Sequence, residues 1–194
     1  MREQSISGIL SCCLPGECTF PELDLETAVD EFLERLPAFY EIPNSASAGL
    51  LPGLDVGNVT LLGLSTLAMR GAPRPFCRKG KPMLEVSVST KGALRFVAPW
   101  RYCSAHSGKL STTSSYVTLN VLFVVADDRV VPVDVWLAWL EGTYVLLEGA
   151  PDAVSAAVSL LGKLVPSIVR DYWVEETAWR SSSVFKAVTD SGRS

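Results

Sequence analysis

Histidine is almost absent from this 194-residue chain, which has His106 alone. Metal-binding motifs that need two histidines are therefore excluded, and little acid–base catalysis by imidazole is expected. The chain also lacks the phosphate-binding loop, the dinucleotide-binding glycine motif and the serine-nucleophile motif G-x-S-x-G. We therefore predict a protein that is not an enzyme, with no catalytic residues, no metal and no cofactor.

Long apolar runs are also absent. A membrane span needs about 20 consecutive apolar residues, and charges at Asp127, Asp134 and Lys163 interrupt the three most apolar stretches. The first four residues do not begin a signal peptide, and Arg2 stands where N-myristoylation requires glycine. These features predict an intracellular protein that is not secreted. The mean hydropathy of +0.26 indicates either a large core or apolar surface kept for a partner.

Cysteine occurs five times, without the spacing of a disulfide framework. Free thiols are therefore expected. The adjacent Cys12 and Cys13 are candidates for lipidation, which would add a membrane anchor. A different interpretation stays open for Cys103 and His106, which have the spacing of metal ligands and, with Cys77, suit a thiol- or zinc-dependent enzyme.

Positive charge gathers in the middle of the chain. Residues 56–126 contain nine Lys or Arg and one acid, a net charge of +8, whereas the rest contains eight basic and 20 acidic residues, a net charge of −12. The total of −4 conceals this division. Segregated charge indicates what a protein touches rather than which reaction it catalyses.

Two amphipathic helices are predicted, one on each side of this basic region. Asp24 is a suitable N-cap for a helix whose apolar residues recur every three or four positions as far as Leu36. Pro151 and Asp152 open the second helix. Its apolar stripe, kinked near Pro166, consists of Val154, Ala157, Val158, Leu161, Val165 and Ile168.

Alternating apolar residues predict an antiparallel meander between the helices. We expect residues 84–88 and 93–97 to form a hairpin turning at Lys91-Gly92, and residues 116–125 and 131–139 to form another, turning at Asp127-Asp128. A turn at Glu141-Gly142 leads to a strand over 143–147. Residues 58–70 suit either a helix or a strand, and their caps, Asn58 and Gly71, favour the helix.

The fold class is therefore α+β, an antiparallel sheet or meander with amphipathic helices packed on one face. We expect a single domain over residues 21–180. A flexible cysteine-containing tail, residues 1–20, precedes it, and a flexible serine-rich tail, residues 181–194, follows it.

Two segments carry six of the nine basic residues in 56–126. Residues 71–82 contain three prolines and two glycines, which predicts an irregular loop, and residues 101–115 form a second, Ser/Thr-rich loop. Cations around an aromatic side chain suit an anionic membrane surface, where each contributes about 1 kcal/mol. The same charges suit RNA phosphates, or acidic faces of this protein on the same or another copy. The candidate membrane- or anion-binding residues are Arg70, Arg74, Phe76, Arg78, Lys79, Lys81, Arg101 and Lys109.

In the order of these features the chain resembles the matrix proteins of rhabdoviruses. An amphipathic helix precedes a glycine-containing apolar segment (61–71), a Pro-rich basic stretch (72–76), a strand with an acidic turn (119–128) and a late amphipathic helix. The resemblance is one of pattern over residues 25–170. The chain has no P-P-x-Y motif and no Lys-rich N-terminal arm. The resemblance implies a viral assembly protein that self-associates, binds the inner membrane face and engages a nucleocapsid.

These observations together predict a non-enzymatic assembly protein. Its expected partners are a second copy of itself, an anionic membrane and a nucleocapsid or other nucleoprotein, and no small-molecule substrate is indicated. It is expected in the cytoplasm, peripherally at the inner membrane face or in a virion. An RNA-binding protein that uses the same basic loops is the alternative, and the thiol- or zinc-dependent enzyme is the second alternative.

Overall fold

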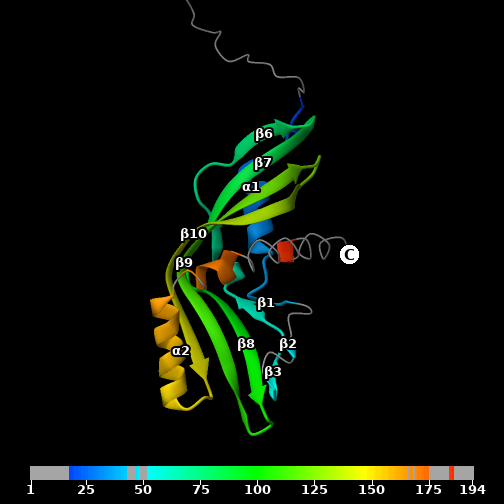
Figure 1. Ribbon diagram of the computed structural model, residues 1–194. Helices are drawn as coiled ribbons and strands as arrows, with labels where there is room; N and C mark the ends of the chain where they lie inside the picture. Colours follow the sequence, from blue (N-terminus) through cyan, green and yellow to red (C-terminus); the bar gives the residue numbers. More distant parts are fainter. Residues whose placement is uncertain are drawn as a thin grey trace, which may run out of the picture.

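Long antiparallel strands give the molecule an elongated frame (Figure 1). The structure, a computed structural model, describes residues 18–42, 47–48, 52–165, 167, 169–174 and 184–185. Ten strands form one sheet, and every strand pair between described residues is antiparallel. In chain order the elements are α1 (Leu25–Glu34), β1 (Phe39–Glu41), β2 (Ser47–Ala48), β3 (Leu54–Val56), β4 (Thr60–Leu62), the 3₁₀ turn η1 (Leu64–Thr66), β5 (Leu67–Met69), β6 (Arg74–Arg78), β7 (Lys81–Thr90), β8 (Leu94–Tyr102), β9 (His106–Val125), β10 (Val130–Glu148) and α2 (Asp152–Leu164).

Strands β7 and β8 lie one after the other along the same edge of β9. Strand β7 pairs with β9 in the register Met83↔Val124, and β8 pairs with β9 in the register Leu94↔Ser114. The two registers differ by only one residue. The chain therefore continues in one direction past Lys91-Gly92 instead of turning back. The predicted hairpin at this point is wrong, because β9 is the partner of both strands. The real turn lies between β8 and β9, within the predicted second basic loop.

Strand β10 follows the other edge of β9 over its whole length. The pairing runs from Val130↔Val125 to Glu148↔Lys109, with two irregularities. The predicted turn at Asp127-Asp128 is confirmed, whereas the predicted turn at Glu141-Gly142 is wrong. Gly142 lies inside the strand with a positive φ of 63°, which glycine adopts without strain. The antiparallel sheet and the α+β class are confirmed.

Residues 58–70 form strands and not the helix that their caps favour. They contain β4, η1 and β5 in succession. Gly63 has a φ of 97° and approaches the main-chain oxygen of Ala93 closely. A side chain there would collide with that oxygen, so this glycine allows the chain to pass from β4 into η1. Strand β4 pairs with β1 and β8, whereas β5 pairs with β7.

Helix α1 is present as predicted, and most of its apolar residues are buried. The carboxylate of Asp24 accepts hydrogen bonds from the main-chain N–H groups of Glu26 and Thr27. These two donors have no acceptor within the first turn of the helix, so Asp24 caps it. Four residues of the helix are buried: Ala28, Val29, Phe32 and Leu33. The edge of the Phe32 ring meets the Phe123 ring of β9 with centroids 5.3 Å apart.

Helix α2 is present as predicted and lies along the free edge of β10 (Figure 1). Of its predicted apolar stripe, Val154, Ala157 and Leu161 are exposed, whereas Val158 and Val165 are half-buried. Its sheet-facing hydroxyls donate to main-chain oxygens of β10: Ser155 to Leu147 at 2.8 Å, and Ser159 to Val145 at 3.3 Å. No residue of α2 is buried. The two helices therefore differ: α1 has four buried apolar residues, and α2 has none. None of the described helices is long and apolar enough to cross a membrane.

The ends of the described chain contribute to the core. The indole N–H of Trp173 donates to the hydroxyl of Thr112 at 2.9 Å, and the Phe185 ring stacks on Phe32. Val184 and Phe185 are fully buried, so the predicted 181–194 tail is wrong at these positions. Cys18, within the predicted 1–20 tail, is joined to β6 by a disulfide to Cys77.

Candidate anion-binding surface

The first basic segment forms a regular β-hairpin, β6–β7, at one end of the molecule (Figure 1). Strand β6 tolerates Pro75 because it is an edge strand whose only described partner is β7. The turn consists of Lys79 and Gly80, both with positive φ, as the tightest hairpin turns require. The predicted irregular loop is therefore wrong, because proline on an edge strand does not interrupt pairing.

This hairpin holds five of the eight candidate residues, named here the hairpin cluster: Arg74, Phe76, Arg78, Lys79 and Lys81. Arg74, Phe76 and Arg78 alternate along β6 and so share one face of the strand. All of β6 is exposed, including 37% of the Phe76 side chain. A partly exposed aromatic ring therefore lies between two cations on one face of β6.

Two of the positive charges of the hairpin cluster lie opposite each other across the hairpin. Arg78 lies directly opposite Lys81 in the strand register, whereas Arg74 lies opposite Glu85. Within the described residues the only ion pair closer than 4 Å joins Arg129 to Asp128. Apart from Glu85, which lies opposite Arg74 without a contact inside 4 Å, no acid in the described part of the chain is paired with the cluster.

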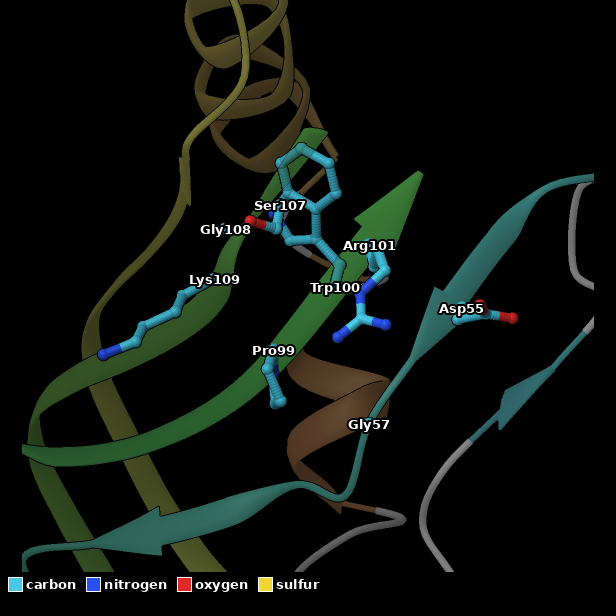
Figure 2. A pocket seen from close by; sticks show the side chains of 8 residues that line it. All are labelled: Asp55, Gly57, Pro99, Trp100, Arg101, Ser107, Gly108 and Lys109. Atoms are coloured by element: carbon cyan, nitrogen blue, oxygen red, sulfur yellow. The ribbon is translucent and has the colours of Figure 1, made fainter. Parts of the chain in front are cut away.

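The second basic segment surrounds a shallow hollow of about 490 Å³ at the opposite end, beside the β8–β9 turn (Figures 1 and 2). Trp100 is held at its rim because the indole N–H donates to the main-chain oxygen of Glu148 at 3.1 Å. Figure 2 shows the charged ends of Arg101 and Lys109 pointing in different directions. Asp55 lies across the strand register from Arg101. The hollow therefore lacks the convergent positive charges that would hold one phosphate.

Arg70 belongs to neither end. Its guanidinium donates to the Tyr116 hydroxyl at 3.1 Å, in a polar hollow of about 680 Å³ that includes Trp139 and Glu141. The nearby hydroxyls of Thr118 and then Ser89 lower the pKa of Tyr116, and the Arg70 charge adds to this effect. Sequence reasoning missed this group because its polar residues alternate along strands, which is typical of any solvent-facing side of a sheet.

The cysteines differ from the expectation of free thiols. Cys18 and Cys77 form a disulfide beside the hairpin cluster, whereas Cys103 is free and exposed at the β8–β9 turn. Cys77 thus lies on a different hairpin from Cys103 and His106. No three metal-binding side chains lie together among the described residues. The lipidation candidates Cys12 and Cys13 lie outside the described residues.

Comparison with protein-family models and with curated proteins gives no match to this chain. The geometry alone therefore ranks the candidate residues. Five of them form the exposed hairpin cluster, two lie around the Trp100 hollow, and Arg70 is engaged with Tyr116. The hairpin cluster is the arrangement best suited to bind an extended anionic surface.

Proposed function

We propose that this protein is a non-enzymatic assembly protein. It binds an anionic membrane surface through the hairpin cluster, and it associates with other copies of itself on that surface. The main support for this proposal is that Arg78 lies opposite Lys81 across the hairpin. Like charges directly opposite each other in a sheet destabilise it. An external anionic surface would offset this repulsion, and each cation near such a surface contributes about 1 kcal/mol.

The shape of the cluster favours a membrane over RNA. Phe76 is exposed on the same face as its flanking arginines, so the ring can enter the headgroup region while the cations stay among the phosphates. Single-stranded RNA is usually bound along a basic groove with several aromatic rings for the bases. The other exposed aromatic near a basic segment, Tyr102, lies at the opposite end. The resemblance to rhabdovirus matrix proteins implies the same two properties, membrane binding and self-association.

Flotation with anionic vesicles tests the proposal directly. The variant carries Arg78→Glu and Lys81→Glu together, which replaces one like-charged pair with another and so preserves the repulsion across the turn. The matched control carries Arg101→Glu and Lys109→Glu at the opposite end, with the same change in net charge. We expect the hairpin variant to lose flotation and the control to retain most of it.

Two results would overturn the proposal. One is equal flotation of the hairpin variant and the wild-type protein. The other is an equal loss in both variants, because that would show a response to net charge alone. Salt-dependent binding to RNA but not to anionic vesicles, lost in the hairpin variant, would favour the RNA-binding alternative.

A further inference from the structure

The outer face of α2 is apolar and exposed, which is the reverse of an ordinary surface helix. The side of α2 towards the sheet contains the half-buried residues Ser155, Val158, Ser159 and Gly162, and its two serines donate to β10. On the outer side Leu160 is 55% exposed and Leu164 is 67% exposed. A helix normally turns such side chains towards the core. Here the inward side has mostly small and polar residues, with Val158 between the two serines, because it covers the free edge of β10.

The outward residues have the spacing of a helix-pairing seam. Ala153, Ala157, Leu160 and Leu164 follow one another at intervals of four, three and four residues, the pattern by which two helices interlock. All four are exposed. In an antiparallel pair the small alanines of one helix would lie opposite the large leucines of the other. The two surfaces are therefore complementary in size as well as apolar.

Charge at the two ends of α2 fits the same geometry. Asp152 in the first turn and Lys163 in the last turn are exposed and lie about 20° apart around the helix axis, since each residue turns the helix by about 100°. They therefore flank the seam on the same side. Two-fold symmetry in an antiparallel pair brings Asp152 of each copy to Lys163 of the other. A parallel pair would place both charges beside apolar residues.

We propose that α2 is a homodimer interface, in which two copies of this chain pair antiparallel through Ala153, Ala157, Leu160 and Leu164, with Asp152 facing Lys163 of the other copy. This inference deepens the proposed function and rests on its self-association. An anionic membrane fits this face less well, because the single cation of the helix, Lys163, is offset by the opposite charge of Asp152. One helix pair forms a small interface, below about 1,200 Å², so dimerisation at micromolar concentrations is expected.

Sedimentation velocity of the full chain over a wide concentration range tests this interface. We expect Leu160→Glu with Leu164→Glu to remove the dimer while thermal unfolding stays unchanged, since both side chains are already exposed. Phe39→Glu is the matched control, because Phe39 is 65% exposed on β1. The control should still dimerise as the wild-type protein does.

A charge swap identifies the second copy as the partner. Asp152→Lys alone and Lys163→Asp alone should each weaken dimerisation about three- to tenfold, because each places like charges together twice. Mixing these two variants should restore a heterodimer, since every contact then joins opposite charges. The double variant should also regain the dimer.

Three outcomes would overturn the inference. If the protein self-associates but neither leucine nor charge variants change it, the interface is wrong while the proposed self-association stands. If the protein stays monomeric at every concentration, with and without vesicles, both the interface and the proposed self-association are wrong. If the leucine variant dimerises as the wild-type protein does but loses binding to neutral vesicles, α2 is a membrane-contacting helix and not a dimer interface. Flotation by the hairpin cluster is measured independently of all three.

Discussion

Cys18 is bonded to Cys77, so the chain just before α1 is fixed to strand β6, 59 residues further on. A disulfide that closes a loop of this length restricts the unfolded chain, which stabilises the fold by about 2 to 4 kcal/mol. We expect Cys77→Ser to lower the free energy of unfolding by that amount in chemical denaturation. Cys103→Ser is the control, because this thiol is free and exposed. Equal stability of the two variants, or insensitivity of the wild-type protein to reductant, would contradict the prediction.

Binding and stability should respond in opposite directions to Lys81→Glu. This change turns the like-charged pair with Arg78 into an opposite-charged pair, so we expect hairpin stability to rise by a few tenths of a kcal/mol. Affinity for anionic vesicles should fall about tenfold to thirtyfold, because the charge at the surface changes by two. Thermal unfolding and vesicle flotation measure the two effects. A variant that is stabilised and still binds fully would show that the hairpin cluster is not the membrane contact.

Acid should weaken the N-cap of α1. Hydrogen bonds from the side chain and then the main chain of Thr27 lower the pKa of Asp24 below its ordinary value of 3.8. The carboxylate therefore contributes stability above the unfolded-state pKa and loses it as pH falls through the folded-state value. We expect Asp24→Ala to be less stable than the wild-type protein at neutral pH, with a difference that narrows below pH 3.8. Asp30→Ala, at an exposed position of the same helix, is the control for the loss of one negative charge.

Local features were predictable where they alone decide the structure. The Asp24 cap and the apolar spacing of α1 specify a helix whichever element it meets. The turn at Asp127-Asp128 is likewise set by neighbouring residues. In contrast, Lys91-Gly92 and Glu141-Gly142 have turn-forming sequences but lie where the chain continues along β9. Pairing with this 20-residue strand overrides the local preference.

The composition of the candidate surface was predictable, but its arrangement was not. The sequence identifies the basic segments and Phe76, since charge and exposure follow from residue type. That the hairpin cluster and the Trp100 hollow lie at opposite ends depends on the length and course of β9. The apolar stripe of α2 was also recognised in part. Its outward direction depends on the main-chain oxygens of Val145 and Leu147, which attract the two serines.

Gly63 should be far less tolerant of substitution than another glycine with similar backbone angles. Gly63 has a φ of 97° beside the Ala93 oxygen, whereas Gly71 has a φ of 78° with open space around it. Gly71→Ala should therefore lower the free energy of unfolding by about 1 to 2 kcal/mol, because alanine must adopt a left-handed conformation but meets no neighbouring atom. We expect Gly63→Ala to cost at least about 2 kcal/mol more, because the main chain must also move. Chemical denaturation of the two variants tests this difference, and equal losses would contradict it.

The buried hydrogen bond between Trp173 and Thr112 should anchor the C-terminal helical residues to the sheet. The indole N–H donates to the hydroxyl at 2.9 Å, and both side chains are buried. Thr112→Val keeps the shape but leaves the N–H without a partner, so we expect a loss of about 1 to 3 kcal/mol in unfolding free energy. Thr112→Ser retains the hydroxyl and loses only a methyl group, which should cost about 1 kcal/mol or less. If the serine variant proves as unstable as the valine variant, packing of the methyl group and not the hydrogen bond holds Trp173 in place.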